Sequence, residues 1–199
     1  MPLTLRIEGA EEMKRRIRAT PKIIVNARRS AVNKIASQAM TQTKKVIRET
    51  YNVKSKDLTP FLKIQRAKGS QIYAVLEASG RPIPLYKFGA RPVMPIEQKG
   101  VPVRGRKPVT VKVKRKGARK IVRGAFVARM RSGHVGIFKR IGTSSIPIEE
   151  KFSLGIKRMF EIRAIPVIKR LVREKGGAIV KHELEWATQR EFQRRGFSE

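Results

Sequence analysis

The uneven distribution of charge constrains this chain more than any other feature. No acidic residue occurs between Gln98 and Ile148, yet that stretch holds fifteen lysines and arginines. Over the whole chain, 47 basic residues stand against 15 acidic ones, which gives a formal net charge of +32. Such a chain repels itself and attracts polyanions. We therefore expect its partner to be a nucleic acid, an acidic protein surface or an anionic membrane.

The remaining composition predicts an ordinary folded protein. The chain has 199 residues, of which 40% are hydrophobic, enough for one domain with a core. Cysteine is absent, which excludes disulfides and thiolate metal sites. The first residues lack the apolar run of a signal peptide, and no stretch has the roughly 20 apolar residues of a membrane span. We expect a soluble protein made inside the cell, with no membrane partner.

The N-terminal quarter predicts a strand and a long helix. Residues Leu3–Gly9 alternate between apolar and polar, as in a short strand. Thr20 is a candidate N-cap, and Pro21 suits the first position of a helix that continues to about Thr50. Its apolar stripe is rich in alanine, so a packing partner can approach closely. The stripe comprises Ile24, Ala27, Ala31, Ile35, Ala39 and Val46.

The middle of the chain predicts strands interrupted by proline. Residues Leu58–Gly80 indicate two strands joined by a turn at Lys68–Ser70. Residues 80–108 hold six of the eleven prolines, which indicates an extended loop or arm because proline lacks a backbone donor. Residues Val109–Lys116 place valines on one side and mainly cations on the other, as in a strand. Residues 120–141 indicate a hairpin that turns at Arg131–Gly133.

Residues 150–195 predict the C-terminal helical part, as one helix or two. Pro166 begins the second helix or kinks a single one, and Gly176–Gly177 is a second weak point. We place Glu149 and Glu150 where the helical part begins, a position that favours carboxylates. The predicted fold is α+β, a single domain over residues 1–199. A long N-terminal helix and C-terminal helices pack on a mainly antiparallel β-sheet, with an extended proline-rich arm.

His134 lies between two glycines in the segment Phe126–Arg140. Of all residues in the chain, it is the first to consider as a catalytic or metal-binding residue. A catalytic base needs a nucleophile or polarised water, and a metal needs about three protein ligands. A metal-dependent nuclease needs two or three convergent carboxylates, yet Asp57 is the only aspartate. We therefore predict no enzyme, no catalytic residue, no metal and no cofactor. The predicted role is a structural turn formed by Ser132, Gly133, His134 and Gly136.

The candidate binding residues are the cations along and before the valine-rich strand. Three lysines on one side of a strand cannot be buried without partners. They can follow a phosphate backbone without reading bases, or contact an acidic ring partner. A solvated edge strand is the alternative, because lysine often guards such edges. The candidates are Arg104, Arg106, Lys107, Lys112, Lys114, Arg115 and Lys116.

Three segments, Gly80–Pro92, Gly100–Arg140 and Ser145–Glu161, together resemble the prophage minor tail protein Z family. They contain Pro-Leu-Tyr-x-Phe-Gly-Ala-Arg, then Gly-Ala-Phe-x-Ala-x-Met-x-Ser-Gly-His-x-Gly-x-Phe-x-Arg, then Leu/Ile-Pro-Ile-x-Glu. Their order and spacing are more specific than any one motif. The many cations over Arg104–Lys120 depart from the family pattern.

The resemblance implies a non-enzymatic virion protein that completes the head-proximal end of the tail of a long-tailed bacteriophage. It implies a homo-oligomeric ring, hexameric to match the tail tube, at the head–tail junction through which DNA passes. The implied partners are the tail terminator, the neck connector or both, and the end of the packaged double-stranded DNA. The 82–108 arm and the N-terminal helix are the candidate ring interfaces. The alternatives are a general sequence-independent nucleic-acid-binding protein, ribosomal-like or architectural, and a nuclease.

Overall fold

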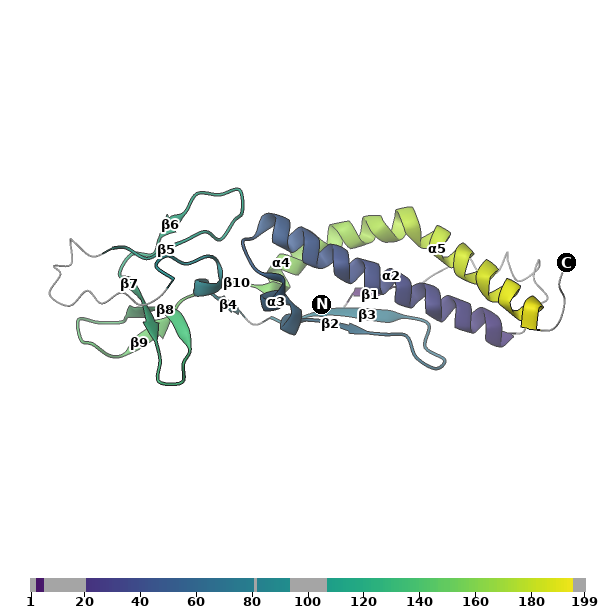
Figure 1. Ribbon diagram of the computed structural model, residues 1–199, viewed down its shortest axis with the longest axis horizontal. Helices are drawn as coiled ribbons and strands as arrows, with labels where there is room; N and C mark the ends of the chain where they lie inside the picture. Colours follow the sequence, from purple (N-terminus) through teal and green to yellow (C-terminus); the bar gives the residue numbers. More distant parts are fainter. Residues whose placement is uncertain (1–2, 6–20, 81, 94–106, 195–199) are drawn as a thin grey trace. The chain divides into compact units, whose positions relative to one another are not determined.

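The computed structural model describes residues 3–5, 21–80, 82–93 and 107–194 (Figure 1). The chain divides into two compact units. The helical unit comprises Met1–Lys44, Leu62–Ala78 and Phe160–Glu199, and the β unit comprises Lys45–Phe61 and Ser79–Met159. Two long helices and several small antiparallel sheets confirm the predicted α+β class. The single domain over residues 1–199 stays a prediction.

Two helices of 30 residues each dominate the helical unit: α2 (Pro21–Thr50) and α5 (Ile165–Arg194). Helix α2 begins at the predicted proline and ends at the predicted residue. Small side chains of α2, Ala27 and Ala31, pack against Val180 and Leu184 of α5. The expected stripe is buried from Ala27 to Ala39, but near the end of α2 it follows Ile47, which is fully buried, rather than Val46.

A three-stranded antiparallel sheet completes the helical unit. Its strands are β1 (Leu3–Leu5), β2 (Leu62–Gln65) and β3 (Ala74–Ala78), in the order β1-β3-β2. One side chain of α2 holds the loop between β2 and β3 through two hydrogen bonds. The Asn33 amide donates to the Ala67 carbonyl at 3.2 Å and accepts from the Ala67 N–H at 2.9 Å. The predicted hairpin is confirmed, although it begins later, after α3 (Ser55–Leu58) and a 3-10 turn, η1 (Thr59–Phe61).

The β unit consists of short antiparallel pairs. Strand β4 (Pro82–Pro84) pairs with β10 (Phe152–Gly155), and β5 (Thr110–Val111) pairs with β6 (Lys120–Ile121). A third sheet runs β7-β8-β9. Its strands are Ala125–Arg129, Val135–Arg140 and Ile148–Glu150. One core joins these pairs, built from Ala90, Val109, Val111, Val127 and Ile137.

Two strand predictions need correction. The strand expected over Val109–Lys116 is regular only at Thr110–Val111, although its valines point into the core as expected. The hairpin expected over residues 120–141 is confirmed as β7 and β8, but Lys120–Ile121 belongs to the separate strand β6, because the chain turns at Gly124 with φ +70°.

The C-terminal helical part begins later in the chain than the sequence predicts. Glu149 and Glu150 both belong to strand β9, and residues 152–155 form β10. No helix therefore begins at the two carboxylates. The helical part starts with α4 (Ile156–Met159) and a π-helical turn, η4 (Phe160–Ala164), and continues as α5. This wider turn directly precedes Pro166, whose ring would clash with a carbonyl of a regular helix. Gly176–Gly177 do not interrupt α5.

The proline-rich range 80–108 is described only in part, because residues 81 and 94–106 lie outside the described residues. Its described portion packs into the β unit. After β4 the chain forms a 3-10 turn, η2 (Leu85–Lys87). Ile83 and Phe88 are fully buried. Among the described residues, no helix is long and apolar enough to cross a membrane.

Candidate functional site

The segment that carries the predicted basic residues is supported along its length by other parts of the β unit. Arg91 and Thr110 exchange backbone hydrogen bonds of 2.8 Å in both directions, and the Lys112 N–H donates to the Phe88 carbonyl at 3.0 Å. On the opposite edge, β5 pairs with β6. Over Thr110–Lys112 this is therefore an internal strand, so its lysine is not needed to guard a free edge.

A glycine fixes the neighbouring segment. Gly89 has φ +63°, a conformation that glycine adopts without strain. A Cβ atom at this position would lie 2.8 Å from the Asn52 side-chain nitrogen. The Asn52 N–H in turn donates to the Val113 carbonyl at 2.8 Å, and the Arg115 N–H donates to the Thr50 carbonyl at 3.0 Å. The motif residue Gly89 and the end of α2 thus both position the basic segment.

The structure brings three of the seven candidate cations together. Lys114, Arg115 and Lys116 form an exposed turn that closes when the Gly117 N–H donates to the Lys114 carbonyl at 3.2 Å. We call these three residues the basic turn. Lys112 precedes it and is half-buried, Lys107 is exposed before β5, and Arg104 and Arg106 lie outside the described residues.

Three of the four described carboxylates in the β unit contact side chains outside the basic turn. Its described acidic residues are Glu49, Asp57, Glu149 and Glu150. Asp57 pairs with Lys87 at 2.9 Å, and Glu149 pairs with Lys151 at 2.6 Å. Glu150 contacts His134 at 2.8 Å. None of these three contacts, within the described part of the unit, involves the basic turn.

His134 lies at the end of a tight turn and contacts a neighbouring strand. The Met130 N–H donates to the His134 carbonyl at 2.8 Å, and Gly133 has φ +80°. The His134 Nε2 lies 2.8 Å from the Glu150 Oε1. Between them, a Cβ on Gly136 would come within 2.7 Å of that oxygen. The glycine therefore leaves room for the carboxylate to reach the imidazole.

In the described residues, Glu150 is the side chain in hydrogen-bond contact with His134. They contain no group of three or more His, Cys, Asp or Glu side chains that could hold a metal. Glu149, whose alteration would test a nuclease, is exposed on β9 and pairs with Lys151. Sequence reasoning missed Glu150 as the partner of His134, because the contact depends on the register of β8 and β9, which pairs Phe138 with Glu150.

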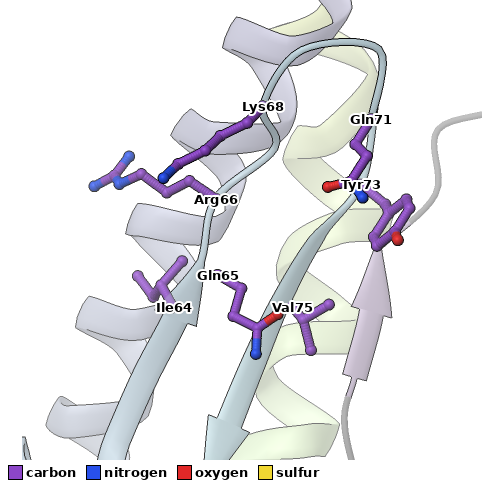
Figure 2. A pocket seen from close by; sticks show the side chains of 7 residues that line it. All are labelled: Ile64, Gln65, Arg66, Lys68, Gln71, Tyr73 and Val75. Carbon is purple, nitrogen blue, oxygen red and sulfur yellow. The ribbon is translucent and has the colours of Figure 1, made fainter.

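A polar hollow lies at the turn of the β2–β3 hairpin in the helical unit. It has a volume of about 530 Å³. Figure 2 shows Arg66 and Lys68 on one arm of the hairpin and Gln71 and Tyr73 on the other, with α2 and α5 behind. The sequence predicted the turn here but not the hollow. Its cations are open to solvent, and it holds no buried polar group aimed at a ligand.

The fold and surface define a strongly basic α+β protein with an exposed turn suited to polyanions. Comparison with known families is more specific. The chain belongs to the family described as prophage minor tail protein Z (GPZ), whose model matches residues 7–193. It is therefore a structural protein of a bacteriophage tail, of a family not known for enzymatic activity. No curated protein and no solved structure matches the chain.

Proposed function

We propose that the protein completes the head-proximal end of the tail as a homo-oligomeric ring at the head–tail junction, and that DNA passes through this ring. The observation that carries the proposal is the basic turn, an exposed run of three cations on a supported segment, for which the described residues show no ion pair with a carboxylate. Directed to the lumen, it would hold the end of the packaged DNA without reading its sequence.

The candidate ring partners remain those expected from the sequence. A ring needs a surface on each copy that fits a different surface on the next. Helix α2 and the 82–108 segment are the proposed contacts between copies, and the tail terminator and neck connector are the proposed neighbours. A hexamer by mass measurement and a density at the neck in cryo-EM images of intact particles are expected. A position at the distal end of the tail would contradict the proposal.

The DNA contact can be tested on the purified protein. A triple variant, Lys114→Gln, Arg115→Gln and Lys116→Gln, should bind a double-stranded oligonucleotide more weakly. Each lost phosphate contact lowers the slope of log K against log salt by about 0.9. The matched control replaces three exposed cations of α5 by glutamine, and these are Lys169, Arg170 and Arg173.

The control separates the proposed ring from a general nucleic-acid-binding protein. A loss of DNA affinity in the basic-turn variant but not in the α5 variant supports a defined DNA contact. Equal losses in both triple variants would show that net charge alone attracts DNA, and would favour the general binding function instead.

A further inference from the structure

A groove between the two long helices has the features of a docking site for a third helix. It has a volume of about 720 Å³, and its lining residues come from α2 and α5 alone. On α2 they run from Lys34 to Gln42, and on α5 from Leu171 to Glu183. At a rise of 1.5 Å per residue, these spans are about 12 Å and about 18 Å long. The groove therefore accommodates two to three helical turns.

The floor and the rim of this groove differ in chemistry. Leu171, Ala178 and Ile179 supply apolar surface, while Gln38 and Gln42 supply amide groups. A phosphate backbone gains nothing from an apolar floor, whereas an amphipathic helix buries its own apolar stripe there. The floor therefore fits a protein helix better than a nucleic acid.

The charges of the rim indicate which helix fits. The Glu183 carboxylate accepts from Ser30 Oγ at 2.6 Å and also binds Lys34 Nζ, so that acid is satisfied internally. Lys175 is exposed on the rim, and no ion pair with a carboxylate is found for it in the described residues. An acidic side chain beside the apolar stripe of the incoming helix would meet Lys175.

A second copy of this chain is a poor occupant. The outward residues of its long helices include exposed cations, such as Lys22 and Lys45 on α2 and Arg173 on α5. These would oppose the lysine on the rim, and like charges at an interface are costly. We propose that the α2–α5 groove binds an acidic amphipathic helix of another tail protein. This inference does not rest on the proposed DNA contact, and any ring contact made by α2 would lie on residues of that helix outside the groove.

The chain contains a built-in reporter of occupancy. Trp186, the only tryptophan, is 50% exposed one helical turn beyond His182, which lines the groove. The Arg190 guanidinium lies 5.1 Å from the centre of its ring. A helix that extends past His182 would cover the indole and change its fluorescence. The substitution Trp186→Phe would remove the fluorescence signal and confirm its origin.

The test uses the full chain and three synthetic peptides of about four turns, built without tryptophan. The first has leucines on one face and glutamates beside them. The second replaces the glutamates by lysines. The third keeps the composition of the first but disperses the leucines around the helix. Only the first should produce a saturable change in Trp186 fluorescence. Equal binding of the third peptide, or no change with the first, would overturn the proposal.

Two substitutions locate the site. Lys175→Glu should weaken binding of the acidic peptide about fivefold through charge repulsion. The matched control, Lys181→Glu, changes an exposed lysine of the same helix outside the groove and should weaken it less. Ala178→Arg should weaken it about tenfold by filling the floor, although it adds positive charge. Tighter binding by Ala178→Arg would show that charge alone attracts the peptide, and would also overturn the proposal.

Discussion

At the scale of single residues, Gly136 has the clearest structural reason for its identity. A Cβ here would lie 2.7 Å from the Glu150 carboxylate and 3.0 Å from the Phe138 ring. The carboxylate can swing away, but it then leaves His134, and the ring belongs to a buried side chain. Close packing against Phe138 and Glu150 therefore accounts for a glycine at this position of the hairpin.

We expect Gly136→Ala to lower the free energy of unfolding by about 1–2 kcal/mol through crowding at Phe138. Gly142→Ala is the matched control, because a Cβ at Gly142 would meet nothing within 4 Å. Denaturant unfolding followed by circular dichroism measures both. Equal stability of the two variants would contradict the packing role of Gly136.

Glu183 supplies a pH-dependent part of the stability. Burial alone would raise the pKa of this carboxyl, but hydrogen bonds from Lys34 and Ser30 outweigh it and hold the pKa below its usual value. A lowered folded-state pKa stabilises the protein above the unfolded-state value of about 4.3. This contribution is lost as the pH falls through the lower, folded-state pKa.

We therefore expect Glu183→Gln to destabilise the protein at pH 7 by about 1–3 kcal/mol. The difference from the unaltered protein should shrink as the pH falls through the lowered folded-state pKa, because the native carboxyl then becomes protonated as well. Glu185→Gln, an exposed neighbour on α5, is the control and should change stability little at either pH. A Glu183→Gln penalty that stays constant from pH 7 to pH 3 would show that ionisation of this group is not the cause.

At the scale of elements, local signals in the sequence located α2 and the β7–β8 hairpin well. Thr20-Pro21 marks the start of α2, because proline is favoured in the first helical turn. The hairpin at Arg131–Gly133 follows from alternation and a turn glycine. Both signals depend only on residues close together in the chain.

Contacts between residues far apart in the chain could not be predicted from the sequence. The basic segment is supported by Phe88–Arg91 and by Thr50–Asn52, and neither contact leaves a pattern within Val109–Lys116 itself. Among the described candidate cations, only the adjacent set Lys114–Lys116 lies together, because adjacency needs no tertiary information. The α2–α5 groove was missed for the same reason, since half of it comes from each end of the chain.

Helix α5 carries a glycine whose replacement should be favourable. Gly177 is exposed within the helix, and a Cβ there would meet nothing within 4 Å. We expect Gly177→Ala to raise the free energy of unfolding by about 1 kcal/mol, because alanine loses less backbone entropy in a helix. Thermal unfolding measures this, and Ala178→Gly should give the opposite shift. A loss of stability in Gly177→Ala would point to a need for the glycine.

At the scale of the whole molecule, the chain passes between its two units after Lys44, Phe61, Ala78 and Met159. Neither unit is a continuous piece of chain, so neither can form before residues distant in sequence meet. This is the physical basis for keeping the prediction of a single domain, which should unfold in one cooperative transition.

Trp186 and Gly136 provide the test, because they belong to different units. If the chain is one domain, Gly136→Ala should lower the unfolding midpoint seen by Trp186 fluorescence as much as that seen by circular dichroism. A fluorescence midpoint unaffected by the substitution would mean that the helical unit unfolds separately.

Because most described carboxylates of the β unit already have partners, many of its cations lack a neutralising charge. We therefore expect dissolved salt to have opposite effects on the stability of the protein and on its binding to DNA. Ions screen the repulsion among unneutralised cations, so moderate salt should make the isolated chain harder to unfold. The same ions compete with the protein for phosphate and should release it from DNA. We therefore expect the isolated protein to be least stable in dilute buffer. Under the same conditions a bound polyanion should stabilise it by supplying negative charge.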